Sequence, residues 1–368
     1  MANLFNEVGL IYGLGGVGEG KELDFSDRDY VRALDHALEA GIYFFDTAEA
    51  YSGGRSEQIL GDWLTYQNRA VVKIATKVSP ENLTAKASIT CLKASLKRLN
   101  TDYVDLYQIH WPNPIFATQE VADTLFALKE TGLVKNFGVC NYSVPQLQNL
   151  ADLTYSLPLV STQIEVSLLD TFQVERGVKC ASELKMSTLA YSPLGKGRLN
   201  AESTLTNRLQ AVAIRNGVTI SQLALAWLRQ LGDVIPIVAT RNKDHLEENI
   251  ASASFSIPDH ELEAVSNIVN GQLTEIPGSK IKIALDGDGN RSVYTTIEEA
   301  LENKLLFEPS PSVLAMEIFE NPDIKPVKVQ KRTSGFFLVE GRIRYWAWRI
   351  AFGPDKPIPC IIVEAQVD

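Results

Sequence analysis

Four polar side chains lie at the ends of apolar segments in the first 110 residues: Asp46, Tyr51, Lys77 and His110. A phenol is a weak acid at neutral pH, and a nearby ammonium favours the phenolate and lowers its pKa. Carboxylate, ammonium, imidazole and phenol groups held together can therefore transfer a proton to a substrate. Each residue alone has an ordinary explanation, since Asp is a common turn residue. The fold must bring the four together for such chemistry.

Eight apolar segments alternate with helical patterns over about 250 residues. The segments are near-continuously apolar, as strands are when both faces of a parallel sheet are covered. The alternation predicts a (β/α)8 TIM barrel, in which functional side chains lie on the C-terminal rim. A doubly wound sheet stays open as an alternative, because periodicity does not show whether a sheet closes. The predicted strands are 9–15, 42–47, 70–76, 103–110, 133–140, 159–165, 187–192 and 233–239.

The glycine-rich stretch GLGGVGEG, at 13–20, contains the glycines of a dinucleotide-binding turn. Such a turn requires a helix to begin at once and an acidic residue about 20 positions later. The segment KELDFSDRD delays the next helix, and acidic residues are too frequent here for the second test to discriminate. A loop on the rim of a barrel is the better interpretation.

Motifs across residues 5–265 resemble the aldo-keto reductase family. The stretch GIYFFDTAEAYSGGRSEQILG is similar to the family's Gly-hydrophobic-Asp-Thr-Ala-x-x-Tyr signature, and IATK and YQIHWP resemble its Lys and His segments. The resemblance continues through FGVCNYS, STQIEVSLL, AYSPLGKGRL and TRNKDHLEENI. It implies an eight-stranded barrel that reduces an aldehyde or ketone to an alcohol.

The resemblance also implies a catalytic tetrad of Asp46, Tyr51, Lys77 and His110. Tyr51 is then the proton donor, and Lys77 lowers the pKa of its phenol. Asp46 holds Lys77 charged and oriented, and His110 positions the carbonyl oxygen. Trp111 indicates an apolar or aromatic wall near the substrate carbonyl.

The hydride donor that the resemblance implies is a nicotinamide cofactor. We favour NADPH over NADH, because Arg241 and Lys243 suit a 2′-phosphate and a guanidinium offers forked donors to phosphate oxygens. Two alternatives stay open: Gln163 as a polar member of a barrel layer, and KDHLEEN as an exposed helix face. The implied cofactor residues are Asn141 and Gln163 at the carboxamide, Tyr191 on the nicotinamide ring, Ser192, Leu194, Gly195 and Lys196 near the pyrophosphate, and Thr240, Arg241, Lys243, Glu248 and Asn249 near the 2′-phosphate and adenine.

Composition argues for a globular protein. The 368-residue chain has 45 acidic and 35 basic residues, a net charge of −10 that makes nucleic-acid binding by the whole molecule unfavourable. Its four cysteines show no C-x-x-C spacing, so we expect neither a metal site nor a disulfide framework. The start lacks the regions of a signal peptide, and no apolar run is long enough to span a bilayer. We expect a soluble, cytoplasmic protein.

The alternation of strands and helices breaks after residue 270. The segment GQLTEIPGSKIKIALDGDGNRSVY is predicted to be a turn region, followed by a helix at 296–306. Strands PVKVQK and GFFLVE, an aromatic helix GRIRYWAWRIAF and a strand IPCIIVEA complete a small C-terminal α+β domain. We predict two domains, a barrel at 1–272 and the α+β domain at 283–368.

Residues 283–365 resemble the ParB and sulfiredoxin superfamily through their strand, Gly-x-x-Arg turn, helix and Ile-Pro strand. The resemblance implies that Gly341, Arg342 and Arg344 cradle nucleotide phosphates at a helix N-terminus. Arg342 stands where sulfiredoxins hold a catalytic cysteine, so sulfiredoxin chemistry is not expected. The alternative is an amphipathic helix whose Trp346 and Trp348 pack the barrel or a partner.

We therefore expect an NADPH-dependent carbonyl reductase. A second hypothesis is a slow-turnover NADP(H)-sensing binding protein, because Cys140 replaces the serine usual beside the carboxamide. A third is a bifunctional enzyme whose C-terminal domain binds a nucleotide.

Overall fold

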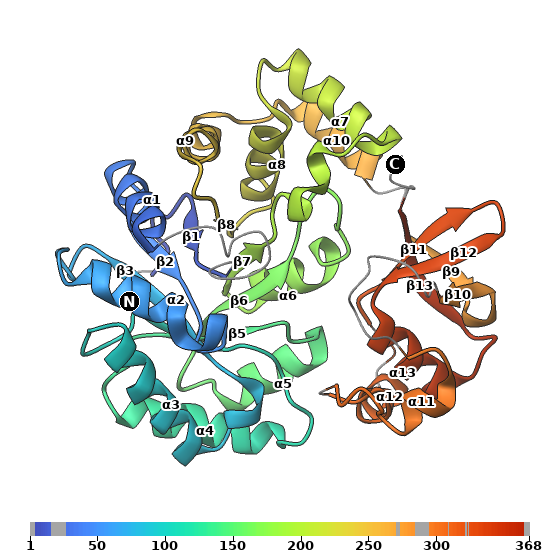
Figure 1. The fold of residues 1–368 in the computed structure, drawn as a ribbon, viewed down its shortest axis with the longest axis horizontal. Coiled ribbons are helices and arrows are strands. Elements are labelled where there is room, and N and C mark those ends of the chain that lie inside the picture. The colour runs from blue at the N-terminus through green and yellow to red at the C-terminus, as the bar shows by residue number, and fades with distance from the viewer. Residues whose placement is uncertain are drawn as a thin grey trace. The chain divides into compact units, whose positions relative to one another are not determined.

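The computed structural model describes residues 4–15, 27–269, 273–283, 294–307, 309–320, 322 and 324–363. The chain divides into two compact units, one of Met1–Leu199 with Ala213–Leu262 and the other of Asn200–Val212 with Glu263–Asp368. Helices α7 (Thr204–Arg215) and α10 (Asp259–Val269) each span the division. Each unit has its own sheet (Figure 1). Each also has its own apolar core.

Within the described part of the first unit, eight parallel strands pair in sequence order and close into a barrel. Closure comes from β1 and β8, where Ile11 pairs with Ile237 and Tyr12 with Val238. The barrel prediction is confirmed and the doubly wound alternative is wrong. The strands are β1 (Ile11–Gly13), β2 (Phe44–Asp46), β3 (Lys73–Val78), β4 (Leu106–Ile109), β5 (Phe137–Cys140), β6 (Leu159–Glu165), β7 (Ser187–Tyr191) and β8 (Val234–Val238).

Helices alternate with these strands along the chain and surround them (Figure 1). Local sequence sets their limits: Thr84, for example, caps α3 by accepting the N–H of Ala87. Most of the glycine-rich stretch at 13–20 lies outside the described residues. The helices are α1 (Asp27–Glu39), α2 (Arg55–Leu64), α3 (Ala85–Arg98), α4 (Thr118–Glu130), α5 (Val144–Leu153), α6 (Lys179–Glu183), α8 (Ile220–Arg229) and α9 (Lys243–Ala251).

Strand side chains alternate between two apolar layers. Phe44 belongs to a compact cluster inside the barrel, whereas its neighbour Phe45 packs into the larger core between strands and helices. Gly61 of α2 allows the close approach of α3, because a Cβ at this position would lie 2.1 Å from the backbone oxygen of Arg98. This packing holds the strands rigidly, so side chains at their ends have fixed positions.

The second unit contains, in its described residues, a five-stranded mixed sheet in the order β10-β12-β11-β13-β9. Two of its strands, β9 (Leu273–Pro277) and β10 (Ile281–Ile283), lie in the segment predicted to be a turn region, so that prediction is wrong. Its Gly and Pro residues indicated turns, but β9 pairs with a strand some 80 residues later along the chain. The other elements are α11 (Ile297–Leu301), α12 (Pro311–Glu320), β11 (Val327–Arg332), β12 (Gly335–Glu340), α13 (Arg342–Phe352) and β13 (Pro357–Val363).

The helices of the second unit differ in part from the predicted ones. Helix α11 is shorter than the predicted helix at 296–306, and the sequence interpretation missed α12. Trp346 and Trp348 are buried in the core of this unit, so the prediction that they pack the barrel or a partner is wrong. Their indole N–H groups donate to the backbone oxygens of Tyr294 and Lys356. Among the described residues, no single helix is long and apolar enough to cross a membrane.

Candidate active site

The barrel brings Asp46, Tyr51, Lys77 and His110 together; we call them the rim cluster. Asp46 ends β2, Lys77 is the penultimate residue of β3, and His110 directly follows β4. Tyr51 begins a short 3-10 helix (Tyr51–Gly54) behind β2. Because the strands are parallel, their carboxyl ends meet at one rim of the barrel.

The Lys77 ammonium lies at the centre of the rim cluster and is fully buried. It donates to Asp46 Oδ1 at 2.6 Å, to the backbone oxygen of Thr47 at 2.9 Å and to Tyr51 Oη at 3.2 Å. Burial lowers the pKa of Lys77, but the nearby Asp46 and Tyr51 outweigh burial, and the net pKa is raised. Lys77 therefore stays charged at neutral pH, next to a phenol.

The phenol of Tyr51 is held in its protonated form. Burial raises its pKa, Lys77 lowers it and Asp46 raises it, with a net increase above the usual value of 10. Lys77 lowers the pKa of Tyr51, as predicted. The net pKa is nevertheless raised, so the prediction that it moves toward neutrality is wrong. Burial has the largest effect on this pKa, because removal of water destabilises the charged phenolate. A protonated phenol beside an ammonium is a group that can donate a proton.

His110 contributes a neutral imidazole to the cluster. Burial, and then the charge of Lys77, lower the pKa of His110 from 6.5 to about 3. Its ring meets the Tyr51 ring edge to face, with centroids 5.5 Å apart. A neutral imidazole carries one N–H donor and one acceptor nitrogen. His110 can thus donate a hydrogen bond to an oxygen next to the Tyr51 hydroxyl without adding charge.

Two buried amides hold the second oxygen of the Asp46 carboxylate. Gln163 Nε2 lies 3.0 Å and Gln108 Nε2 3.4 Å from Asp46 Oδ2. Gln163 is thus engaged below the rim cluster, at a barrel-layer position that the sequence interpretation left open. Sequence reasoning missed Gln108, which lies on β4 two residues before His110 and so faces the same side.

Asn141 and Tyr191, predicted to contact the nicotinamide, are joined to each other and to His110. Tyr191 Oη donates to Asn141 Oδ1 at 2.9 Å, and Asn141 Nδ2 donates to the backbone oxygen of His110 at 3.1 Å. Asn141 follows β5 with a φ of +63°, a conformation that asparagine tolerates better than most residues. Cys140, directly before it, is buried.

The segment predicted to lie near the pyrophosphate follows β7 on the same rim. Ser192, Gly195 and Lys196 all have positive φ, with the Gly195 N–H donating to the Ser192 oxygen. The Lys196 ammonium forms an ion pair with Glu165 Oε1 at 3.1 Å. Sequence reasoning missed Glu165, which ends β6. Leu194 packs against the core between strands and helices.

The segment predicted to bind the 2′-phosphate and adenine follows β8. Thr240 accepts a hydrogen bond from Tyr12 Oη through its backbone oxygen, and Arg241 donates to Tyr30 Oη. Lys243 lies on the exposed face of α9, paired with Glu247 at 3.6 Å. The other two predicted residues point elsewhere: Glu248 accepts from Thr219 Oγ1 before α8, and Asn249 is buried.

Comparison with known proteins agrees with this geometry. The aldo/keto reductase family matches residues 9–270. The chain belongs to this family. It is 33% identical over 261 residues to an aldo-keto reductase of Mycolicibacterium smegmatis, covering 70% of this chain and 87% of the relative. It is also 32% identical over 251 residues to an aldo-keto reductase of Mycobacterium avium, an alignment that covers 67% of this chain and 84% of the relative.

Solved aldo-keto reductases share the barrel. A thermostable enzyme in complex with the inhibitor epalrestat superimposes with a TM-score of 0.66 and 30% identity over 71% of this chain and 94% of that one. The aldo-keto reductase from Klebsiella pneumoniae in complex with NADPH superimposes with a TM-score of 0.63 and 25% identity, over 70% of this chain and 90% of that one. The family match ends at residue 270, so it does not extend over β9–β13 of the second unit.

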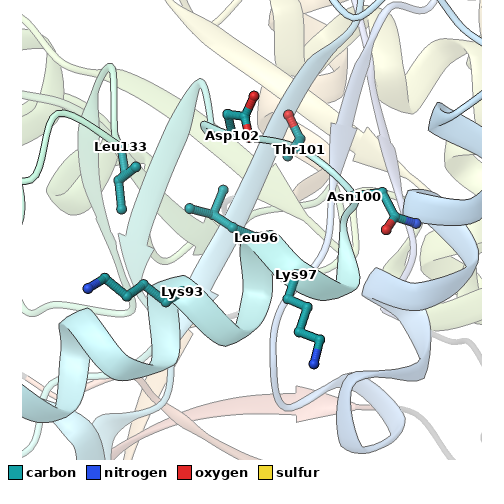
Figure 2. A pocket seen from close by; sticks show the side chains of 7 residues that line it. All are labelled: Lys93, Leu96, Lys97, Asn100, Thr101, Asp102 and Leu133. Atoms are coloured by element: carbon teal, nitrogen blue, oxygen red, sulfur yellow. The ribbon is translucent and has the colours of Figure 1, made fainter.

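Outside the rim cluster, this aldo-keto reductase has a shallow depression of 530 Å³ on the barrel exterior. Figure 2 shows Leu96 and Leu133 in it, flanked by the long side chains of Lys93 and Lys97. Its residues lie at the end of α3 and just before β4 and β5, at the amino ends of the strands. The depression therefore lies at the opposite end of the barrel from the rim cluster. Trp111, in contrast, follows His110 on the rim and is 48% exposed.

Proposed function

We propose that this aldo-keto reductase reduces an aldehyde or ketone to an alcohol, with Tyr51 as the proton donor. The chain is an NADP-dependent oxidoreductase, and its cofactor is NADPH. The observation that carries the proposal is the position of Lys77, whose ammonium hydrogen-bonds both Asp46 and Tyr51. NADPH, when bound, supplies the hydride that attacks the carbonyl carbon.

The rim cluster supplies the proton and stabilises the charge that forms. As the carbonyl oxygen gains negative charge, Tyr51 Oη transfers its proton to that oxygen. The Lys77 ammonium, 3.2 Å away, stabilises the resulting phenolate, and Asp46 keeps Lys77 in place. The neutral His110 donates a hydrogen bond that orients the carbonyl oxygen. Trp111 lines the substrate side of the site.

The residues around the rim suit a dinucleotide with negative phosphates. Asn141 and Tyr191 offer an amide and an aromatic ring beside His110, and the turn at 192–196 carries Lys196, which pairs with Glu165. Arg241 and Lys243 flank the start of α9, where the helix dipole also favours negative charge. Gln163 can hold a carboxamide while it stays bonded to Asp46, because its amide has a second N–H and an acceptor oxygen.

The buried Cys140, at the position where a serine is usual beside the carboxamide, supports a second candidate function. A protein that senses NADP(H) and turns over slowly would retain the cofactor tightly and reduce carbonyls at a low rate. Multiple fast turnovers on any carbonyl would contradict it.

We further propose that the chain has the two domains predicted at 1–272 and 283–368, with the second extended to include β9 and β10 of its sheet, and that this α+β domain resembles the ParB and sulfiredoxin superfamily. Gly341 caps α13 with a φ of +92° and the Arg344 guanidinium folds close to it, which supports an anion such as a nucleotide phosphate at this turn. Arg342 begins the helix. A substitution of both arginines by Gln should abolish ATP or phosphate binding measured by calorimetry on the full chain; unchanged binding would contradict this role.

The reductase proposal is tested by NADPH oxidation with a panel of aldehydes and ketones, with the wild type beside Tyr51→Phe. We expect repeated turnover in the wild type and its collapse in the variant, with NADPH binding retained. Tight NADPH binding without turnover on any carbonyl would contradict the reductase and favour the sensing protein.

A further inference from the structure

One contact of the segment after β8 links it to the first helix of the barrel. Arg241 lies three residues after β8 and two before α9. Its Nη1 donates to the hydroxyl of Tyr30 on α1 at 2.7 Å, and its guanidinium carbon lies 5.0 Å from the centroid of the Tyr30 ring. Tyr30 is 7% exposed and belongs to the core between strands and helices. An otherwise flexible arginine is thereby tied to a rigid, buried side chain.

A second contact joins α1 to α9, the helix that follows Arg241. His36 Nε2 lies 3.4 Å from Glu247 Oε1, and the same oxygen is 3.6 Å from Lys243 Nζ. Helix α1 therefore borders both cations that flank the start of α9. The structure places α1 as a support for this cationic turn, although α1 itself carries none of the residues predicted to bind the cofactor.

Fixing an arginine before its ligand arrives has a definite physical effect. A free arginine side chain loses rotamer freedom when it binds a phosphate, and this loss weakens binding. A guanidinium has five N–H donors in a fixed fork, so a bond from Nη1 to a hydroxyl orients the whole group. Preorganisation strengthens only those interactions in which the oriented group takes part.

We propose that Tyr30 is a positioning residue that determines cofactor specificity: its hydroxyl orients Arg241 toward the 2′-phosphate of NADPH. NADH lacks that phosphate, so Tyr30 strengthens the binding of NADPH and not of NADH. This inference rests on the proposed contact of Arg241 with the 2′-phosphate.

The test measures the dissociation constants of NADPH and NADH by fluorescence titration of the full chain. In Tyr30→Phe, which keeps the ring and removes the hydroxyl, we expect NADPH to bind about fivefold to tenfold more weakly, as for the loss of one ordinary hydrogen bond. NADH binding should change less than twofold. Tyr155→Phe is the matched control, since Tyr155 is 82% exposed, and both its constants should stay as in the wild type.

A merely structural role would give a different result. If Tyr30→Phe weakens NADPH and NADH equally, or changes neither, the inference about Tyr30 is overturned. Thermal unfolding in the absence of cofactor identifies a variant that has lost its fold. Tyr30→Trp gives a second test, because an indole has an N–H donor but no hydroxyl to accept from Arg241. This variant should fail to recover the preference for NADPH.

Arg241→Met separates this inference from the proposed function. We expect it to lose most of the preference for NADPH, and the double variant with Tyr30→Phe to lose no more than Arg241→Met alone, because the two residues act as one unit. Loss of preference in Arg241→Met without any effect of Tyr30→Phe would overturn only the role of Tyr30. Full preference in Arg241→Met would overturn the proposed contact of Arg241 itself.

Discussion

Two buried carboxylates at opposite ends of the barrel strands are surrounded by cations, and only one of them lies in a site suited to catalysis. Asp46 pairs with Lys77 at the carboxyl end of the strands. Asp105, fully buried just before β4, is bound by Arg69 at 2.9 Å, Lys135 at 3.3 Å and Lys73 at 3.7 Å. We call Asp105 with these three cations the Asp105 cluster.

The two clusters differ in what the cations touch besides the carboxylate. Lys77 hydrogen-bonds the hydroxyl of Tyr51, whereas Arg69 and Lys135 lie over the ring of Tyr103, at 3.9 and 3.7 Å from its centroid. Lys77 also lies over the ring of Tyr51, 4.8 Å from its centroid, but it contacts in addition the hydroxyl that carries the proton to be transferred. A buried ion pair is therefore not in itself a sign of catalysis; a protonated phenol held against the ammonium is.

The largest expected difference concerns the two tyrosines. Tyr51→Phe removes the proton donor and should lower kcat by about 10³-fold, within the usual range for a general acid. Tyr103→Phe keeps the ring under its cations and should change kcat less than twofold. Steady-state NADPH oxidation on one shared carbonyl measures both, and comparable losses in the two variants would show that the clusters do not differ as described.

Asp105→Asn should affect stability rather than activity. Replacing the buried carboxylate leaves three cations without their common partner, and we expect a loss of about 2–3 kcal/mol in the free energy of unfolding by urea. The exposed pair of Asp27 and Arg55 provides the control, because Asp27→Asn should cost less than about 1 kcal/mol. A folded Asp105→Asn enzyme with strongly reduced kcat would contradict a structural role.

His110 should make stability depend on pH. Its pKa is about 3 in the folded chain and 6.5 normally, so below pH 6.5 the unfolded chain binds a proton that the folded chain does not. Stability therefore falls as the pH decreases from 6.5 toward 3, and His110 should account for about 1–2 kcal/mol between pH 7 and pH 5. Urea unfolding of the wild type and His110→Asn at both pH values checks this; an equal loss in both would show that His110 is not responsible.

The smallest expected effect concerns Gln108, whose amide donates, with that of Gln163, to the second oxygen of the Asp46 carboxylate. Gln108→Met should lower kcat about fivefold, the equivalent of one hydrogen bond. Gln119, whose amide donates to Asp123 on the surface, offers the control, and Gln119→Met should leave kcat unchanged. A loss of stability without any change in kcat would indicate that Gln108 only fills the barrel.

Local patterns predicted the barrel strands because each is a nearly continuous apolar run; for β6 the prediction at 159–165 agrees residue by residue. Closure was not predictable from periodicity, because it depends on the pairing of β1 with β8, more than 200 residues apart. The same reason explains β9 and β10, whose Gly- and Pro-containing segment forms strands only because distant partners pair with it.

The candidate site was predictable where a side chain ends a strand, as Asp46 does. The partners that adjust its chemistry were not, because they come from other strands and helices: Gln108 below Asp46, Glu165 beside Lys196 and Tyr30 under Arg241. The direction of the pKa shift of Tyr51 could not be predicted from the sequence either, because it depends on how deeply the fold buries the phenol.

The most direct test of the account compares one lysine from each cluster. Lys77→Met and Lys135→Met are prepared side by side, shown to bind NADPH, and assayed for NADPH oxidation on one carbonyl substrate. We predict that Lys77→Met loses at least about 100-fold in kcat, because the phenolate of Tyr51 is no longer stabilised, while Lys135→Met stays within twofold of the wild type. A Lys77→Met enzyme that binds NADPH and turns over within tenfold of the wild type would contradict the central role of the rim cluster.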